Sequence, residues 1–243
     1  MTTIAANLQA LRLRIAAAEA RFERAPGSVQ LIGASKTQTV AALRAALAAG
    51  LNRFGESYAR EALDKIIALA DLHPEWHYIG PLQRNKTRIV AENFAWVHSL
   101  DRLALAARCN GQRPAALAPL QVCIQVNISG EPSKSGIEPD ALTDFAAALG
   151  DLPRLCLRGL MAVPAPTPDF NTQRAAFLRL RALYDELRVR GYPLDTLSMG
   201  MSDDLEAAIA AGATLVRIGT ALFGSRPATV ARDRNESQAS SRD

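Results

Sequence analysis

The stretch VQLIGASKT, residues 29–37, contains the features from which the fold of this chain can be read. An apolar run over residues 29–34 is typical of a buried strand, and a helical pattern follows over residues 40–49. Lys36 lies between the two, in the connection that leaves the end of the strand. Ligands bind at this edge of a parallel sheet, so Lys36 is a candidate binding residue, with an ordinary solvated lysine as the alternative.

Strands and helices continue to alternate over the rest of the chain. Strand-like runs occur at residues 53–55, 75–79, 95–99, 121–127, 156–161, 196–199 and 215–218. Helical patterns lie between them at residues 58–69, 86–91, 103–111, 140–149, 172–190 and 205–211. Eight strand–helix units in a chain of 243 residues predict an α/β fold, a closed (β/α)₈ TIM barrel. An open doubly wound sheet is the alternative, because periodicity does not show closure.

The two ends of the chain differ in character. Residues 1–25 have the apolar spacing of an amphipathic helix, which predicts an extra N-terminal helix rather than a signal segment. We expect a single domain over residues 1–226. A polar, disordered tail is expected over residues 227–243, because that segment lacks an apolar face.

Composition argues against several classes of function. Hydrophobic residues make up 49% of the chain and charged residues 21%, which is ordinary for a soluble globular protein. The net charge of +4 owes much to arginines of the tail, so nucleic acid is not expected as a partner. The chain contains no apolar run of about 18 residues, so no membrane-spanning helix is expected. The three cysteines are widely spaced, which indicates neither disulfides nor a metal site and is typical of a cytoplasmic protein.

The connections after the last two strands carry the residue types of a phosphate site. Residues 197–202 read LSMGMS, and Ser202 is a candidate N-cap of the helix that follows. Residues 217–221 read RIGTA, in which Gly219 permits close approach of the backbone and Thr220 offers an amide and a hydroxyl. Phosphate sites in these barrels are frequently built from the loops after strands seven and eight. Taken singly, each motif could equally be an ordinary turn, in which small residues are common.

Closure of the barrel would place Lys36 beside this phosphate site, because the first strand is then adjacent to the eighth. A lysine near a phosphate can bind it as a point charge, or it can form a Schiff base with an aldehyde. Pyridoxal 5′-phosphate (PLP) carries both an aldehyde and a phosphate. The residues therefore fit PLP, with a phosphate-bearing metabolite bound by charge alone as a distant alternative.

Seven segments of the chain carry a resemblance to a known family. They are LIGASKT (31–37), RFGESYAREALDK (53–65), WHYIGPLQRNKTR (76–88), VHSLDR (97–102), IQVNISGEPSKSGI (124–137), LRGLMAVPAP (157–166) and LSMGMSDDLEAAIAAGATLVRIGTALFGSR (197–226). In this order they resemble the pyridoxal phosphate homeostasis protein family, over almost the whole chain apart from the tail. Proteins of that family are single-domain PLP-binding barrels of fold type III, similar to the N-terminal domain of alanine racemase.

The resemblance implies a set of cofactor-binding residues. Lys36 would carry the PLP aldimine, Arg217 would face the pyridine nitrogen, and the phosphate would be bound by Ser198, Gly219, Thr220 and the Met199 amide. Asn127, at the end of a predicted strand, is a further candidate contact. The family usually reads Phe-Gly-Glu-Asn where this chain has Ser57 after Glu56, so a hydroxyl replaces an amide there. An arginine does not share a proton with the ring as a carboxylate can, which weakens carbanion chemistry.

Two functions from different classes fit these implications. The first is a non-catalytic PLP carrier that buffers the cofactor and delivers it to apo PLP-dependent enzymes. The second is a racemase-like PLP enzyme, which needs a second base; in alanine racemases a tyrosine from an additional domain supplies it. This chain ends soon after its eighth unit, and its four tyrosines do not suggest a replacement at the barrel mouth. We therefore expect the carrier, without catalytic residues, as a cytoplasmic monomer.

Two further side chains have open interpretations. Lys134, in the loop after the fifth strand, is either a second amine that accepts or releases PLP or an exposed loop lysine. His77 is either an acid–base group near the cofactor or a hydrogen-bonded structural residue.

Overall fold

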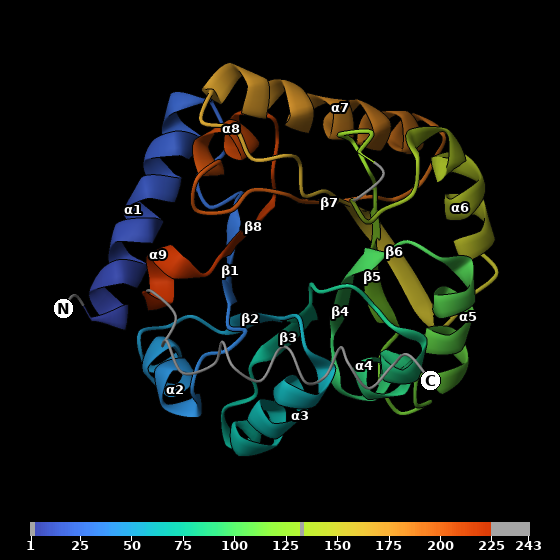
Figure 1. Ribbon diagram of the computed structural model, residues 1–243, viewed down its shortest axis with the longest axis horizontal. Coiled ribbons are helices and arrows are strands. Elements are labelled where there is room, and N and C mark those ends of the chain that lie inside the picture. Colours follow the sequence, from blue (N-terminus) through green and yellow to red (C-terminus); the bar gives the residue numbers. More distant parts are fainter. Residues whose placement is uncertain (1–2, 132–133, 225–243) are drawn as a thin grey trace.

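The computed structural model describes residues 3–131 and 134–224 and shows a closed barrel of eight parallel strands inside a ring of helices (Figure 1). The strands are β1 (Gln30–Ala34), β2 (Arg53–Glu56), β3 (Glu75–Tyr78), β4 (Trp96–Leu100), β5 (Leu120–Gln125), β6 (Leu155–Met161), β7 (Thr196–Ser198) and β8 (Leu215–Ile218). β1 pairs with β8 from Gln30 opposite Leu215 to Gly33 opposite Ile218, which closes the barrel. The predicted TIM barrel is confirmed, and the open-sheet alternative is wrong.

All eight strands predicted from the sequence form, with ends that differ from the expected ones by at most two residues. The largest difference is in β5, for which the pattern predicts an end at residue 127 and the strand ends at Gln125. Beyond that point Val126 makes an isolated bridge with Ile137, and the Asn127 amide donates to the Ile137 carbonyl oxygen. The ladder therefore passes from the barrel to the following loop.

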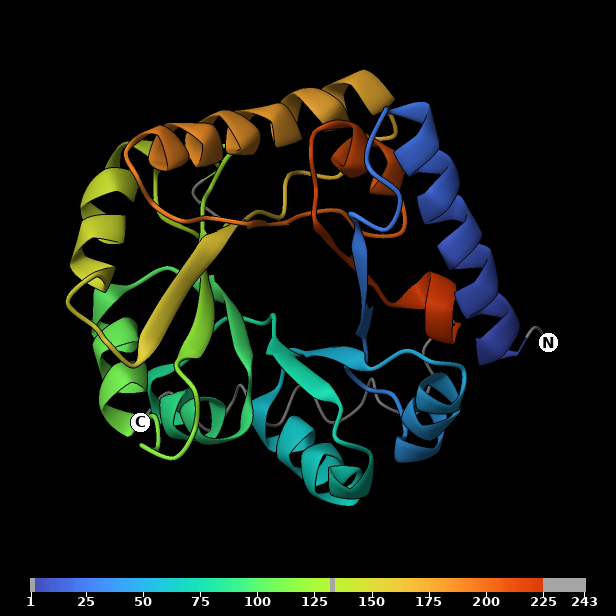
Figure 2. The same cartoon turned by 180° about the vertical axis from the view of Figure 1, so that it is seen from behind.

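The helices form the outer layer of the barrel. They are α1 (Ile4–Arg21), α2 (Val40–Ala48), α3 (Ala59–Ala68), α4 (Thr87–Asn93), α5 (Leu103–Gln112), α6 (Leu142–Leu149), α7 (Phe170–Val189), α8 (Leu205–Ala210) and α9 (Thr220–Phe223). The predicted N-terminal helix, α1, packs against α2, α8 and α9 and so covers the region where β8 meets β1 (Figures 1 and 2). Helix α9 is not predicted by the sequence pattern, because four residues are too few to show a helical period.

The structure does not describe every segment for which the sequence makes a prediction. The tail at residues 227–243 lies outside the described residues, as do Pro132 and Ser133 in the loop after β5. Within residues 3–131 and 134–224, no helix is long and apolar enough to cross a membrane.

Two strands approach closely at Gly159 of β6. It lies opposite Thr196 of β7, and a Cβ atom added to it would overlap the Thr196 carbonyl oxygen. We predict that Gly159→Ala lowers the free energy of unfolding by about 3 kcal/mol, because the two backbones must separate. Urea denaturation followed by circular dichroism measures this difference.

Gly111→Ala in α5 is the matched control for this prediction. No atom lies within 4 Å of the Cβ position at Gly111, so alanine is expected to raise stability by about 0.5–1 kcal/mol through its helix propensity. A Gly159→Ala protein as stable as the wild type would contradict the pairing of β6 with β7.

Candidate functional site

A cavity of about 680 Å³ opens where the strands end, at the edge of the barrel where the sequence predicts a site. Its walls come from the connections after β1, β2, β3, β6, β7 and β8. The wall residues that carry polar groups or lie at the strand ends include Lys36, Ser57, Tyr58, Gly80, Ser202, Asp203, Arg217, Gly219 and Thr220. Barrel closure thus brings Lys36 of the first connection to the same cavity as Arg217, Gly219 and Thr220.

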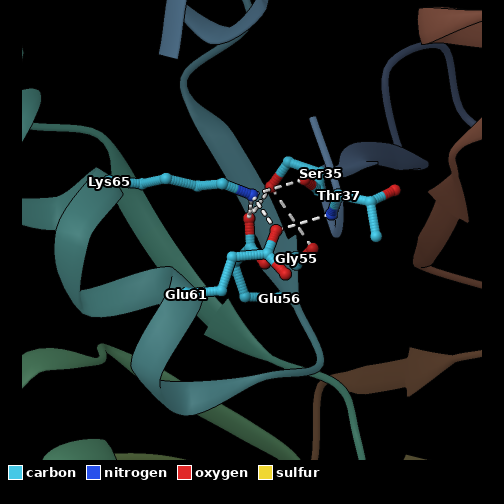
Figure 3. A network of polar contacts seen from close by, with 6 residues as sticks. All are labelled: Ser35, Thr37, Gly55, Glu56, Glu61 and Lys65. Carbon is cyan, nitrogen blue, oxygen red and sulfur yellow. Dashed lines mark hydrogen bonds and ion pairs between the residues drawn. The ribbon is translucent and has the colours of Figure 1, made fainter. Parts of the chain in front are cut away.

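The two neighbours of Lys36 in the chain, Ser35 and Thr37, are held by a network that includes side chains of β2 and α3 (Figure 3). Lys65 Nζ donates to the Ser35 carbonyl oxygen at 2.7 Å, and the Thr37 amide donates to Glu61 Oε1 at 2.6 Å. Thr37 has a φ of 66°, a left-handed conformation that is costly for a β-branched residue. These bonds therefore fix the direction in which the chain leaves β1 and so position Lys36.

Two charges of this network, those of Lys65 and Glu56, are deeply buried. Lys65 is 4% exposed and Glu56 is 0% exposed, and the two form an ion pair of 2.7 Å. Burial raises the pKa of the Glu56 carboxyl, and Lys65 acts against this increase. Glu56 Oε1 also accepts from the Ser35 hydroxyl at 2.6 Å, whereas Oε2 is buried with no hydrogen-bond partner. Glu56 therefore depends on Lys65 as its counter-charge.

Arg217 reaches the cavity wall from β8 and is 5% exposed. Nη1 donates to Ser198 Oγ at 2.6 Å, and Nη2 donates to the Ala162 carbonyl oxygen at 3.1 Å. Burial lowers the pKa of Arg217 to about 10, so the guanidinium is still charged at neutral pH. A guanidinium has five N–H donors, and these two bonds leave others for a ligand.

Ser202 lies on the cavity wall, and its predicted role as a helix N-cap is wrong. The sequence predicts Ser202 as the N-cap of α8, but the N-cap is Asp204, whose Oδ1 accepts from the Met201 amide at 2.5 Å. Helix α8 begins at Leu205, as the helical pattern predicts, so Ser202 remains in the loop and lines the cavity together with Thr220. Thr220 is the first residue of α9, and phosphate sites in these barrels are often built at such a short extra helix.

Three predicted site residues are not among the wall residues of this cavity: Ser198, Met199 and Asn127. The Ser198 hydroxyl is fully buried and hydrogen-bonded to two side chains of the barrel interior. The Met199 amide donates to a carbonyl oxygen of β8, and the Asn127 side chain donates within its own loop. Direct contact of these three residues with a cofactor stays a prediction.

One tyrosine lies at the mouth of the barrel, which the sequence analysis did not anticipate. Tyr58 lines the cavity and is 46% exposed, although the sequence suggested no tyrosine as a replacement for the second base there. Tyr78 is buried, and its hydroxyl donates to the carbonyl oxygens of Ser57 and Pro81. Burial raises the pKa of Tyr78 to about 12, so this side chain serves the structure as a neutral hydrogen-bond donor.

His77 of β3 and His98 of β4 lie inside the barrel and are 1% and 0% exposed. Burial lowers the pKa of both imidazoles, for His98 well below the ordinary value, against the raising effect of Glu75 on His77. Neither histidine is a wall residue of the cavity that contains Lys36. Both are therefore neutral, hydrogen-bonded groups of the barrel interior.

These histidines make stability depend on pH. Below about pH 6.5 the unfolded chain takes up a proton on His98, whereas the lowered pKa of His98 in the folded chain opposes this uptake. The free energy of unfolding therefore falls by up to about 1.4 kcal/mol per pH unit for this residue, and His77 contributes in the same direction. We predict that between pH 6.5 and pH 5 the wild type loses about 2 kcal/mol more than His98→Gln. Urea unfolding at several pH values measures this difference, and equal pH dependences would contradict a neutral His98. The comparison cancels the opposing contribution of Glu56, whose raised pKa adds stability as pH falls.

A second cavity of about 590 Å³ adjoins the first, because Val163, Met201 and Asp203 belong to both walls. It is lined by Lys134 and by residues 163–168 of the proline-rich connection after β6. Lys134 thus lies at a cavity that neighbours the one containing Lys36.

The first cavity has the chemistry that PLP requires. Lys36 offers an amine for the aldehyde, and Ser202, Gly219 and Thr220 offer hydroxyls and backbone for the phosphate. Arg217 offers donors for the pyridine nitrogen. The volume lies within the range of small-molecule sites, about 300–1,000 Å³. The residues present therefore fit this cofactor.

Comparison with known proteins points to the same ligand. The family model described as alanine racemase, N-terminal domain, matches residues 6–227. The pyridoxal phosphate homeostasis protein of Pseudomonas aeruginosa is 58% identical over 226 residues, which cover 93% of this chain and 97% of that protein. The protein of the same name from Escherichia coli K12 is 51% identical over 229 residues, covering 93% of this chain and 98% of that protein.

Solved structures give the same picture at the level of the fold. PipY of Synechococcus elongatus, solved with PLP bound, superimposes with a TM-score of 0.80 at 37% identity and covers 91% of this chain and 100% of that chain. Alanine racemase from Corynebacterium glutamicum superimposes with a TM-score of 0.64 at 15% identity, over 90% of this chain and 61% of that chain. The likeness to the racemase shows a shared barrel fold and no more.

Proposed function

Because the chain belongs to the family of pyridoxal phosphate homeostasis proteins, we propose that it binds PLP and acts in the homeostasis of this cofactor. One observation carries the proposal: Lys36 and Arg217 lie on the wall of the same cavity, together with Gly219 and Thr220. The structure of PipY with PLP bound, at 37% identity, supports the same ligand.

Five wall residues would hold the cofactor: Lys36, Ser202, Arg217, Gly219 and Thr220. Lys36 would hold the aldehyde of PLP through a C=N bond, formed with loss of one water molecule and reversed by addition of water. Gly219, Thr220 and Ser202 bind the phosphate, and Arg217 donates a hydrogen bond to the ring nitrogen. Ser198 acts on the cofactor through Arg217, to which its hydroxyl is bonded at 2.6 Å.

Arg217 also decides what the bound cofactor can do. When bound, PLP supplies an electron sink for carbanions, and this sink is strong only if the ring nitrogen is protonated. The Arg217 guanidinium, with a pKa of about 10, donates a hydrogen bond at neutral pH and keeps its own proton. The arginine therefore holds the ring in place without activating it, which favours a carrier over a catalyst.

Transfer of PLP to an apo-enzyme tests the carrier function. The chain is loaded with PLP, freed of excess cofactor by gel filtration and mixed with an apo PLP-dependent enzyme. The expected result is that the activity of the recipient returns, and more slowly with Lys134→Ala because Lys134 lines the neighbouring cavity. Retention of the cofactor by the loaded chain while the recipient stays inactive would contradict a role in delivery.

The second candidate, a racemase-like enzyme, is supported by Tyr58 on the cavity wall. A tyrosine there could serve as the second base that racemisation requires. Exchange of the amino-acid α-hydrogen in deuterium oxide separates the two functions. We expect no stereospecific exchange above that of free PLP; exchange that depends on Tyr58 would establish an enzyme instead.

The proposal extends to the setting in which the chain acts. We place it in the cytoplasm, acting as a monomer whose partners are PLP and apo PLP-dependent enzymes. Sedimentation at micromolar concentration, with and without PLP, tests the monomer; a stable dimer would contradict it.

A further inference from the structure

A chain of hydrogen bonds crosses the interior of the barrel and ends on Arg217. Glu75 Oε1 lies 2.8 Å from His77 Nε2, and His77 Nδ1 lies 2.9 Å from His98 Nε2. His98 Nδ1 lies 2.7 Å from Ser198 Oγ, which accepts from Arg217 Nη1 at 2.6 Å. The last four residues are 0–5% exposed, so one buried path links β3, β4, β7 and β8.

The direction of every bond in this path follows from its two ends. The hydrogen bond with His77 lowers the pKa of Glu75, so its carboxylate is ionised and can only accept. Neutral His77 then donates through Nε2 and accepts at Nδ1, which requires His98 to donate through Nε2 and accept at Nδ1. The Ser198 hydroxyl is left as the donor to His98 Nδ1. Arg217 has no acceptor, so all donors point from Arg217 toward Glu75.

We infer that Glu75, His77, His98 and Ser198 are positioning residues that orient Arg217 toward the ring of PLP. The inference rests on the proposed function, because it assigns the ligand that Arg217 faces. A serine hydroxyl rotates freely unless its partners fix it. Here His98 Nδ1 accepts the hydrogen bond of the Ser198 hydroxyl, so an Oγ lone pair is directed at the Arg217 guanidinium.

Two hydrogen bonds, one to a backbone oxygen and one to a side-chain hydroxyl, set the plane of the Arg217 guanidinium. Nη2 of Arg217 donates to the carbonyl oxygen of Ala162, which is a fixed backbone group. Nη1 donates to Ser198 Oγ, and the direction of that lone pair depends on the tautomers of two histidines on β3 and β4. The orientation of the arginine at the cavity is thus controlled from the opposite side of the barrel interior.

The far end of the path meets solvent. The Glu75 side chain is 39% exposed, and with His77 it lines a separate cavity of about 200 Å³. Arg53 pairs with Glu75 at 3.1 Å, and Arg158 and Asp195 line the same small cavity. Glu75 is the first residue of β3, so this cavity lies at the end of the barrel opposite the site that contains Lys36. The polar path therefore runs through the barrel from one end to the other.

The tautomers of the histidines test the direction of the path without any ligand. The chain has three histidines, and a His73→Gln variant identifies the signals of the buried pair in long-range ¹H–¹⁵N correlation spectra. We expect both buried histidines to be neutral with the proton on Nε2 from about pH 7 to pH 8. A proton on Nδ1 of either imidazole would reverse the path and overturn the inference.

Matched substitutions at His98 test the positioning itself. His98→Phe keeps a ring but removes both nitrogen atoms, whereas His98→Gln retains one donor and one acceptor. We expect His98→Phe to weaken PLP binding about tenfold and to shift the visible absorption band of the bound cofactor, and His98→Gln to stay within about threefold of the wild type. Wild-type affinity and spectrum in His98→Phe would show that the histidines only satisfy each other in the core.

A second variant covers the case in which His98→Phe does not fold. Ser198→Ala removes only the hydroxyl between His98 and Arg217. We again expect PLP binding to weaken about tenfold, because about one hydrogen bond to a charged group is lost. Unchanged binding in Ser198→Ala would overturn the inference. Absence of PLP binding by the wild type would overturn the proposed function as well, whereas normal binding with a proton on Nδ1 would overturn the positioning path alone.

Discussion

Lys65→Met is expected to lower the free energy of unfolding by about 3–5 kcal/mol, because it leaves the buried Glu56 carboxylate without its counter-charge. Glu56 is 0% exposed, so water cannot replace the lost ammonium group. The substitution also removes the bond from Lys65 to the Ser35 carbonyl oxygen, which holds the chain next to Lys36. Urea unfolding at neutral pH, followed by circular dichroism, measures the loss.

Two controls separate this effect from general damage to the core. Adding Glu56→Gln to Lys65→Met is expected to restore about half of the lost stability, because a neutral amide needs no counter-charge. Arg88→Met removes an exposed ion pair with Glu92 and is expected to change stability by less than about 0.5 kcal/mol. A Lys65→Met protein as stable as Arg88→Met would contradict the role assigned to the buried network.

Lys36→Ala and Lys36→Arg are both expected to weaken PLP binding on the order of a hundredfold, which corresponds to about 2.7 kcal/mol. Neither side chain can form the C=N bond with the aldehyde, although arginine keeps the positive charge. The pair therefore distinguishes a covalent role of Lys36 from binding by charge alone. Equilibrium dialysis with detection of PLP by absorbance provides the measurement.

Lys134→Ala is the matched lysine control for these variants, and we expect its equilibrium affinity for PLP to equal that of the wild type. If Lys36→Arg bound PLP as tightly as the wild type, the lysine would act as a point charge. The alternative of a phosphate-metabolite site at this cavity would then gain support.

The barrel could be predicted from the sequence because its strands are short apolar runs separated by turn residues. β8 begins and ends where the pattern places it, at Leu215 and Ile218. Eight units predict a closed barrel, the pairing of β1 with β8 shows the closure, and closure brings Lys36 to the cavity that contains Arg217. This part of the site needs only strand order, not side-chain geometry.

Contacts across the barrel interior could not be predicted in the same way. His77 and His98 are 21 residues apart in the chain, and His98 and Ser198 are 100 residues apart. No local pattern indicates that these three side chains lie next to one another. Whether their side chains meet depends on the stagger between strands of the closed barrel, which no local pattern contains.

The two serines of LSMGMS show the same limit on a smaller scale. Ser198 is the last residue of β7, and its hydroxyl is buried inside the barrel, whereas Ser202 lies in the loop on the cavity wall. Ser202, Asp203 and Asp204 are all residue types that cap helices, so the sequence does not show which of them is the N-cap of α8 and which stay in the loop.

Borohydride reduction of the PLP-loaded chain, followed by peptide mass spectrometry, tests the central claim most directly. Reduction of the C=N bond fixes the cofactor on the amine that holds it, and the chain has only four lysines: Lys36, Lys65, Lys86 and Lys134. The account predicts one reduced pyridoxyl group per chain, on the peptide that contains Lys36. An unmodified Lys36 in a chain that retains PLP, or a label spread equally over the four lysines, would contradict the account.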